Sequence, residues 1–243
     1  MTNFTWASLA PAIPEIYLAG AVCALLVEPV QGEGGVLPAA ADFLAGLRAL
    51  CDRHDALLIC DEIQCGMGRT GTLYAHAQDG IEPDAVTLAK ALGAGFPIGA
   101  LLVGARAAEA LGNGAHGTTF GGNPLAAAVA QVALRRLSDV ALLAQVQARG
   151  QALRAGLMSI AADTGAIAGV RGRGLMLGAL LGGALAGKAG VLVDHALAAG
   201  VLVLQAGPDV LRLLPPLVLD DADVAAGLER LHAAVRSALA ASC

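Results

Sequence analysis

Four short, continuous apolar runs restrict the possible fold more than any other feature of the sequence. They cover Val22–Val27, Ala56–Cys60, Ala85–Ala89 and Gly99–Val103. Between the first two runs, Ala39–His54 has the apolar spacing of a helix, with Phe43, Leu47 and Leu50 on one face. Short strands that are buried on both faces and separated by helices or loops are typical of a mostly parallel α/β sheet. We therefore predict that fold class.

Polar residues directly follow the second and the third of these runs. Asp61 comes after the second run and Lys90 after the third. In open α/β sheets, ligands bind beyond the carboxyl ends of the strands. Asp61 and Lys90 are therefore the first candidates for a functional site.

The pattern of the sequence changes near residue 140. Before that point, Asn123–Leu137 is predicted to be a helix with Asn123 as its N-cap and Pro124 at its first position, and another helix is predicted over Ala141–Ala161. The elements predicted after it are a Gly-rich strand region (Val170–Leu181), a short helix (Val191–Ala199), two strands (Val201–Leu204 and Val210–Leu214) and an amphipathic helix (Asp221–Ala240). We predict a partial large domain over residues 1–139 and a small α+β domain over residues 140–243.

The composition excludes several classes of protein. Hydrophobic residues make up 56% of the chain and charged residues 14%, which excludes a disordered protein. The longest apolar stretches are interrupted before the roughly 20 residues that a spanning helix needs, and no cationic segment precedes an apolar core at the N-terminus. A net charge of −5 with 3% aromatic residues offers little to a nucleic acid. We expect a cytoplasmic protein that binds neither membrane nor nucleic acid.

Five cysteines without a C-x-x-C pair favour a reducing compartment over a disulfide framework. We regard them as structural residues and predict no metal site.

Lys90 and Lys188 are the only lysines in the chain. A buried Lys90 would have a lowered pKa and a nucleophilic amine, whereas a lysine at a strand end is more often exposed to water. Asp61 could cap a helix, pair with a cation or keep a heterocyclic nitrogen protonated. Gln64 carries an amide that could donate to a phenolic oxygen. Taken one at a time, these residues leave both interpretations open.

Several segments together resemble the class III pyridoxal-phosphate aminotransferases in their order and spacing. The segments are Glu28–Gly35, Asp61–Gln64, Gly68–Gly71, Lys90–Gly95, His116–Pro124, Val170–Leu175 and Leu211–Pro216. The resemblance covers nearly everything from Val22 onward. It is strongest to the acetylornithine and succinylornithine branch, with the ornithine and 4-aminobutyrate branches as alternatives. It implies the large domain of fold type I, the aspartate aminotransferase-like fold, followed by a small α+β domain.

The resemblance implies a role for each residue that matches a cofactor-binding position. Lys90 would be the catalytic lysine that binds pyridoxal 5'-phosphate covalently, and Asp61 would pair with the pyridine nitrogen. Gln64 would contact the phenolic oxygen of the cofactor. Thr119 would reach the cofactor phosphate of a neighbouring subunit, so a homodimer is implied.

The resemblance also implies a substrate-binding set. Arg212 would bind a substrate carboxylate in one half-reaction and be neutralised by Glu33 in the other, because an arginine meets a carboxylate with two parallel hydrogen bonds. Glu28 and Thr118 complete the expected set. The implied reaction transfers the ω-amine of N-acetylornithine, or a related ornithine derivative, to 2-oxoglutarate, as in arginine biosynthesis. A truncated, catalytically impaired fragment that retains the fold is the alternative.

One part of the family pattern has no counterpart here. Met1–Leu18 is too short to supply the family's phosphate-binding loop, its stacking aromatic residue and a substrate-binding arginine. Phe4 and Trp6 are aromatic, but their sequence context does not match the family. We therefore expect the N-terminal part of the family fold to be missing from this chain.

Overall fold

The computed structural model describes residues 22–241, so Phe4 and Trp6 lie outside the described residues. The chain divides into two compact units. The first contains residues 22–29, 39–68 and 72–139, and the second contains residues 30–38, 69–71 and 140–241. No helix in the described part combines the length and the hydropathy that crossing a membrane requires.

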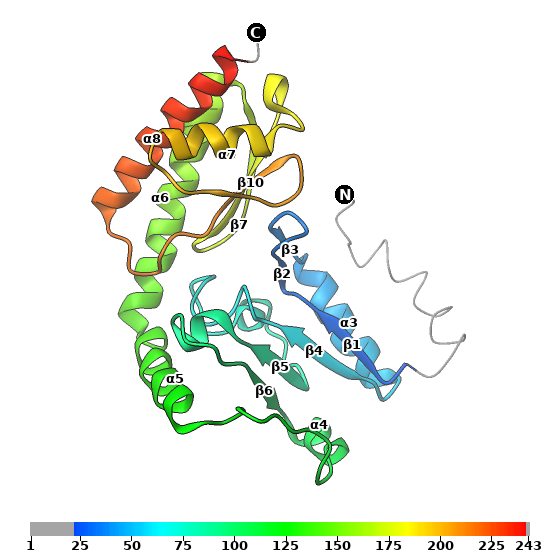
Figure 1. Cartoon of the computed structure of the whole chain (residues 1–243). Coiled ribbons are helices and arrows are strands. Elements are labelled where there is room, and N and C mark those ends of the chain that lie inside the picture. The colour runs from blue at the N-terminus through cyan, green and yellow to red at the C-terminus, as the bar shows by residue number, and fades with distance from the viewer. Residues whose placement is uncertain (1–21, 242–243) are drawn as a thin grey trace. The chain divides into compact units, whose positions relative to one another are not determined.

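The first unit is built on a four-stranded sheet with the strand order β1-β4-β5-β6 (Figure 1). Its strands are β1 (Ala24–Val27), β4 (Leu57–Asp61), β5 (Ala85–Leu88) and β6 (Ala100–Val103). The first three are mutually parallel, and β6 runs antiparallel to β5. All four predicted apolar runs form strands of this sheet, and the prediction of a mostly parallel sheet is confirmed.

Helix α3 (Ala41–Arg53) packs against β4 through its apolar face. Phe43, Leu47 and Leu50 are all buried there and form one cluster with Leu58 of β4. The periodicity of the sequence predicted this face correctly. Helix formation here depends on burial of that stripe, because no side chain caps the helix at Ala40.

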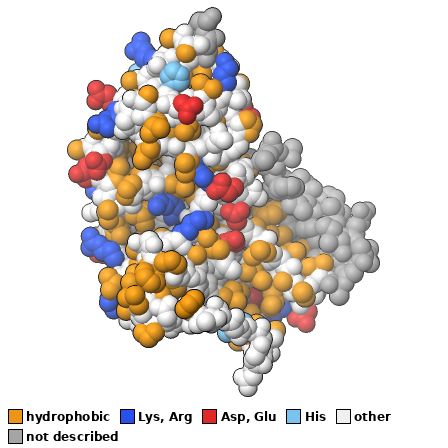
Figure 2. Space-filling view, in the orientation of Figure 1, with side chains coloured by type: hydrophobic (Ala, Val, Ile, Leu, Met, Phe, Trp, Pro, Cys, Tyr) orange, Lys and Arg blue, Asp and Glu red, His pale blue; other side chains and the backbone are white. Residues whose placement is uncertain are grey.

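The other helices of the first unit are short, except for one. They are the 3₁₀ helices η1 (Ala75–Asp79) and η2 (Lys90–Gly93), and the α-helices α4 (Ala105–Ala110) and α5 (Pro124–Leu137). Asn123 caps α5, with its Oδ1 accepting a hydrogen bond from Ala126 N at 2.9 Å, as predicted. Helix α5 packs against η2. Its opposite side leaves Leu125 and Val132 exposed, and Figure 2 shows hydrophobic side chains gathered over this helix.

A buried carboxylate joins strands and helices at the amino end of β5. Asp84 accepts hydrogen bonds from Leu58 N and from Arg48, both at 2.8 Å, and Arg106 contacts its other oxygen at 3.3 Å. Burial acts to raise the pKa of Asp84. The hydrogen bonds and the two guanidinium charges outweigh burial, so the pKa is lowered overall.

The second unit contains an antiparallel four-stranded sheet with the order β7-β8-β10-β9. Its strands are β7 (Ile167–Arg173), β8 (Met176–Leu181), β9 (Leu204–Gln205) and β10 (Val210–Leu213). The predicted Gly-rich strand region over Val170–Leu181 consists of two strands joined by a tight turn. The strand predicted over Val201–Leu204 is also displaced, since the chain pairs with β10 only at Leu204 and Gln205.

Three α-helices of the second unit pack on this sheet and on one another, with a 3₁₀ helix between β8 and α7. They are α6 (Val140–Thr164), α7 (Ala189–Ala198) and α8 (Asp221–Ala240), and the 3₁₀ helix is η3 (Gly183–Leu185). Leu153 and Leu157 of α6 are buried about one turn apart, as a core-facing helix requires. A capping box in which Asp220 and Asp223 bond each other's backbone begins α8.

Two short segments from the first part of the sequence belong to the second unit, which the predicted boundary at residue 140 did not anticipate. One is the hairpin of β2 (Val30–Gln31) and β3 (Leu37–Pro38), where β3 packs against β7. The other contains Arg69, whose Nη1 donates to the carbonyls of Leu175 and Pro215 at 3.2 and 2.5 Å. Burial lowers the pKa of Arg69 to about 10. Contacts with residues far away in the sequence, which local periodicity does not reveal, place both segments there.

Candidate functional site

Three predicted site residues of the first unit follow three adjacent parallel strands. Glu28 follows β1, Asp61 is the last residue of β4, and Lys90 comes two residues after β5. The register pairs Val27 with Cys60 and Asp61 with Thr87. Because these strands are parallel, their carboxyl ends meet at the same edge of the sheet. The sheet therefore brings two carboxylates and an amine to one edge.

The carboxylate of Asp61 is held on one side only. Its Oδ1 accepts hydrogen bonds from the Thr87 hydroxyl and from Ile63 N, both at 3.0 Å. Its Oδ2 accepts no hydrogen bond from any residue that the structure describes. The side chain is half-buried. This oriented carboxylate can therefore accept one further hydrogen bond from a bound group.

Thr87 was not among the predicted site residues, although it contacts Asp61 directly. Its hydroxyl donates to Asp61, while its carbonyl accepts a hydrogen bond from Glu62 N at 3.0 Å. Within the apolar run Ala85–Ala89 it is the single polar residue. That isolated hydroxyl in a buried strand was the signal that could have identified it.

Glu62 fixes the loop that follows Asp61. It is fully buried and accepts hydrogen bonds from Ala75 N at 2.7 Å, from His76 N at 2.8 Å and from His76 Nδ1 at 2.6 Å. A buried carboxylate that loses such partners is costly, so this loop has one strongly preferred conformation. The backbone around Asp61 is rigid as a result.

Lys90 lies on the surface of the described chain, with its backbone in an unusual conformation. Its φ is +45°, in the left-handed region that residues other than glycine rarely adopt. Strained backbone of this kind is concentrated at functional sites. Of the two interpretations that the sequence left open, the described residues agree with an exposed lysine at a strand end, because the Lys90 side chain is exposed. The described residues place the amine at this edge of the sheet but do not shield it from water.

The other predicted residues of this unit are Gln64, which is close to Asp61 in the sequence, and two threonines from a different segment. Gln64 is half-buried, in the loop three residues after Asp61. Thr118 and Thr119 are exposed, in the segment between α4 and α5. Among the described residues, no hydrogen bond joins either threonine to Asp61 or Lys90. The first unit by itself thus assembles Asp61 and Lys90, and it leaves the two threonines outside that group.

The second unit contains the predicted pair of Glu33 and Arg212. Arg212 lies on β10, where it pairs with Gly178 of β8 and Leu204 of β9, and it is only 7% exposed. Its Nη1 lies 2.5 Å from Glu33 Oε1. Glu33 is on the turn between β2 and β3, and 76% of its side chain is exposed. A buried guanidinium therefore meets a carboxylate that can leave for solvent.

Arg171 holds the turn that carries Glu33, a role that the sequence did not reveal. Its Nε donates to Gly35 O at 2.8 Å from strand β7. Burial lowers the pKa of Arg171. The spacing of 136 residues between these two partners explains why no local pattern could have predicted the contact.

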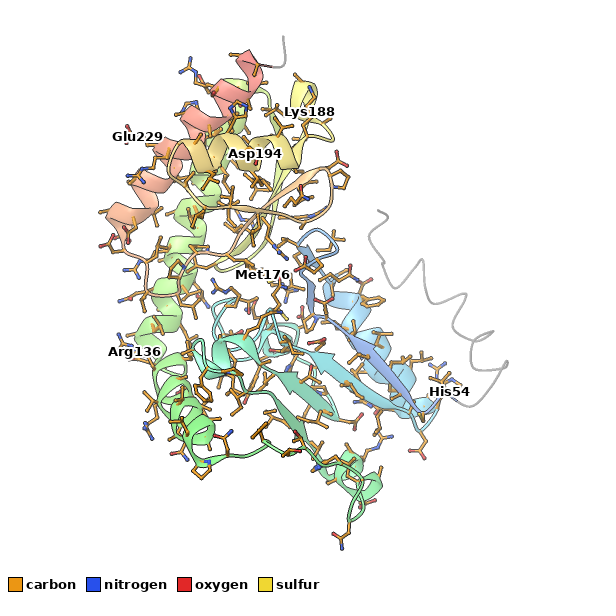
Figure 3. The ribbon with its side chains drawn as sticks, viewed as in Figure 1. His54, Arg136, Met176, Lys188, Asp194 and Glu229 are labelled. Atoms are coloured by element: carbon orange, nitrogen blue, oxygen red, sulfur yellow. The ribbon has the colours of Figure 1, made fainter. Side chains whose placement is uncertain are left out.

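Lys188 is a poor alternative to Lys90. It lies in the second unit as the N-cap residue of α7 (Figure 3). It follows no parallel strand, and the helix it begins is part of the packing of that unit. Among the described residues, no group of three His, Cys, Asp or Glu side chains could hold a metal ion.

The residues of the first unit fit a pyridoxal-type cofactor. A carboxylate with one fixed oxygen and one available oxygen suits a protonated ring nitrogen, and a primary amine suits a carbonyl carbon. The strand register holds both at one edge. The fit rests on Asp61, Thr87 and Lys90 within one unit.

Known proteins of one family match this chain along most of its length. The sequence model of the class III aminotransferases matches residues 14–235. An acetylornithine aminotransferase of Xanthomonas campestris is 60% identical over 230 residues, which are 95% of this chain and 56% of that protein. A succinylornithine transaminase of Yersinia pseudotuberculosis is 54% identical over 209 residues, which are 86% of this chain and 50% of that protein.

Solved structures agree with these relatives. N-acetylornithine aminotransferase from Stenotrophomonas maltophilia matches with a TM-score of 0.88 and 55% identity, over 95% of this chain and 61% of that one. An ornithine aminotransferase from Toxoplasma gondii, with pyridoxal phosphate at partial occupancy, matches with a TM-score of 0.87 and 34% identity, over 97% of this chain and 55% of that one. The chain thus spans about half the length of the relatives it matches. It belongs to the class III aminotransferases, a family of pyridoxal-phosphate enzymes.

Proposed function

We propose that this chain carries the lysine and the ring-binding acid of a pyridoxal-phosphate-dependent aminotransferase that acts on an ornithine derivative. The observation that carries the proposal is the arrangement at the carboxyl edge of β4 and β5. Asp61 ends one strand with a single oxygen fixed, and Lys90 follows the neighbouring parallel strand with a strained backbone. Gln64, in the same loop as Asp61, is proposed to contact the phenolic oxygen of the cofactor.

Bound pyridoxal phosphate supplies an electron sink for the carbon that bears the amine. The role of Asp61 is to keep the ring nitrogen protonated through its Oδ2, while Thr87 and Ile63 hold Oδ1. Lys90 anchors the cofactor through its amine. With its amine free, Lys90 would serve as the general base that moves a proton at the reacting carbon.

The second unit is proposed to select the substrates. Arg212 is buried and oriented by its strand, so its guanidinium can bind a substrate carboxylate when Glu33 moves away. The relatives named acetylornithine aminotransferase and succinylornithine transaminase support an acylated ornithine as donor. We propose N-acetylornithine as the donor and 2-oxoglutarate as the acceptor, in arginine biosynthesis, with Glu28 and Thr118 also contacting substrate.

We further propose that the protein is a cytoplasmic homodimer in which Thr119 contacts the cofactor phosphate of the neighbouring subunit. The exposure of Thr119 in the segment before α5 supports this role, because the side chain is accessible to another chain. A size measurement by light scattering, with and without pyridoxal phosphate, tests the dimer.

A second candidate function is cofactor binding without turnover. The exposure of Lys90 favours it, because an exposed amine lacks the desolvation that makes a lysine nucleophilic.

Absorption spectroscopy with added pyridoxal phosphate tests these proposals. We expect a visible band of covalently bound cofactor that Lys90→Ala abolishes and the control Lys188→Ala retains. Turnover of N-acetylornithine with 2-oxoglutarate supports the aminotransferase, and a band without turnover supports the second candidate. A protein with no band, or a band that survives Lys90→Ala, contradicts both.

A further inference from the structure

The hydroxyl of Thr87 is the only side-chain group among the described residues that donates a hydrogen bond to the carboxylate of Asp61. The bond measures 3.0 Å and reaches Oδ1, the same oxygen that accepts Ile63 N. Both residues are half-buried. The two donors therefore converge on one oxygen and leave the other oriented away from them.

The strand pairing places the two residues of this contact beside each other. Asp61 and Thr87 are directly paired residues of the parallel strands β4 and β5. The carbonyl of Thr87 also accepts a hydrogen bond from Glu62 N at 3.0 Å. Thr87 thus holds the backbone after Asp61 and the Asp61 side chain at the same time. As a β-branched residue it has restricted rotation about χ1, so its hydroxyl is held in a narrow range of directions.

We infer that Thr87 is a positioning residue for the cofactor, acting through Asp61. It sets the rotamer of the carboxylate so that Oδ2 is presented to a protonated ring nitrogen before the cofactor arrives. A carboxylate that is already oriented loses less conformational entropy when the cofactor binds. This inference rests on the proposed function, because it requires that Asp61 meets the ring.

The position of Thr87 also connects the acid to the lysine. Thr87 lies on β5, three residues before Lys90, so one short segment carries the amine and the hydroxyl that orients the carboxylate. Asp61 itself ends the neighbouring strand β4. The relative position of the amine and the carboxylate is therefore set by the pairing of β4 with β5.

Pyridoxal phosphate affinity of the purified chain, measured by spectroscopic titration, tests the inference. Thr87→Val removes the hydroxyl and keeps the branched shape, and we expect about tenfold weaker binding, the size of one lost hydrogen bond to a charged group. Thr87→Ser keeps the hydroxyl and should bind within about twofold of the unmodified protein. Thr72→Val is the matched control, since the half-buried Thr72 donates to Tyr74 O at 2.7 Å elsewhere in the same unit. It should leave the affinity unchanged.

A double-mutant cycle separates positioning from a general structural role. If Thr87 acts through Asp61, then Thr87→Val should add little to the effect of Asp61→Asn on affinity. Equal losses in both backgrounds, or unchanged affinity of Thr87→Val alone, would overturn the inference while the proposed function stands. An unmodified chain that binds no pyridoxal phosphate would overturn both.

Discussion

In the first unit the charged groups of the site lie beyond the ends of parallel strands, whereas in the second unit Arg212 lies within a central antiparallel strand. Asp61 ends β4 and is oriented by the hydrogen bond from Thr87, and Lys90 begins the 3₁₀ helix that follows β5. Arg212 is oriented by its neighbours in the sheet and lies among four consecutive buried residues of β10. At strand ends the backbone can adopt strained conformations, and the side chains can point in different directions. A central strand gives a fixed direction but requires a partner for the buried charge.

Gly172, near the end of β7, should be one of the positions of the second unit that tolerate a side chain least. A Cβ on Gly172 would lie 2.0 Å from Met176 O, and its φ is +114°. We expect Gly172→Ala to lower the free energy of unfolding by about 3 kcal/mol or more, from strain and clash together. Gly95→Ala in the first unit is the control, since its φ of +104° is similar but nothing lies within 4 Å of the added Cβ. It should cost about 1 kcal/mol. Chemical denaturation measures both, and equal losses would show that space is not the deciding factor.

The buried carboxylate of Asp84 in the first unit should make the free energy of unfolding depend on pH in the acid range. The pKa of Asp84 is lowered in the folded state, so the unfolded chain takes up its proton first as the pH falls. The stabilisation is complete above about pH 5 and is lost as the pH falls through the folded pKa. Asp84→Asn should cost about 2 kcal/mol at neutral pH and flatten the acid limb of a plot of unfolding free energy against pH. An unchanged acid limb would contradict this assignment.

The ion pair of the second unit should respond unequally to loss of its two members. Glu33→Ala leaves a buried guanidinium without this carboxylate, and we expect a loss of about 1.5 kcal/mol. Arg212→Met replaces a buried charge by an apolar side chain of similar length, which should cost less than about 1 kcal/mol. Thermal unfolding of both variants decides this. A larger loss for Arg212→Met would mean that the arginine stabilises the sheet by itself.

Substitutions at helix N-caps should show the smallest difference in lost stability between the two units. Asn123→Ala removes one hydrogen bond at the start of α5, and Asp220→Ala breaks a capping box of two at the start of α8. We expect about 1 kcal/mol for each, with Asp220→Ala the larger. Thermal unfolding curves of the two variants measure it. If Asn123→Ala cost more, packing of α5 on η2 would have to depend on the cap.

The sequence predicted the first unit better than the second because its signals are local. The apolar runs, the helical face of α3 and the Asn123 cap each lie within one segment, and all are found in the structure. The association of residues 30–38 and 69–71 with the second unit depends on contacts across long stretches of sequence, such as that between Arg171 and Gly35. Periodicity contains no information about such partners.

The site was predicted unevenly for the same reason. Asp61 and Lys90 could be placed because strand ends are visible in the sequence. Thr87 was passed over because a single hydroxyl in an apolar strand looks like an ordinary β-branched residue. The sequence left open whether Lys90 is buried or exposed, since this depends on which residues surround it in space.

The left-handed backbone at Lys90 implies that the residue which supplies the amine lowers the stability of the folded chain. A residue with a Cβ at φ +45° carries a conformational penalty of about 1 kcal/mol that glycine would not. Lys90→Gly should therefore unfold at a higher temperature than Lys90→Ala, although it lacks the amine and is expected to be inactive. The amine thus stands at a position where the main chain would favour a residue without a Cβ.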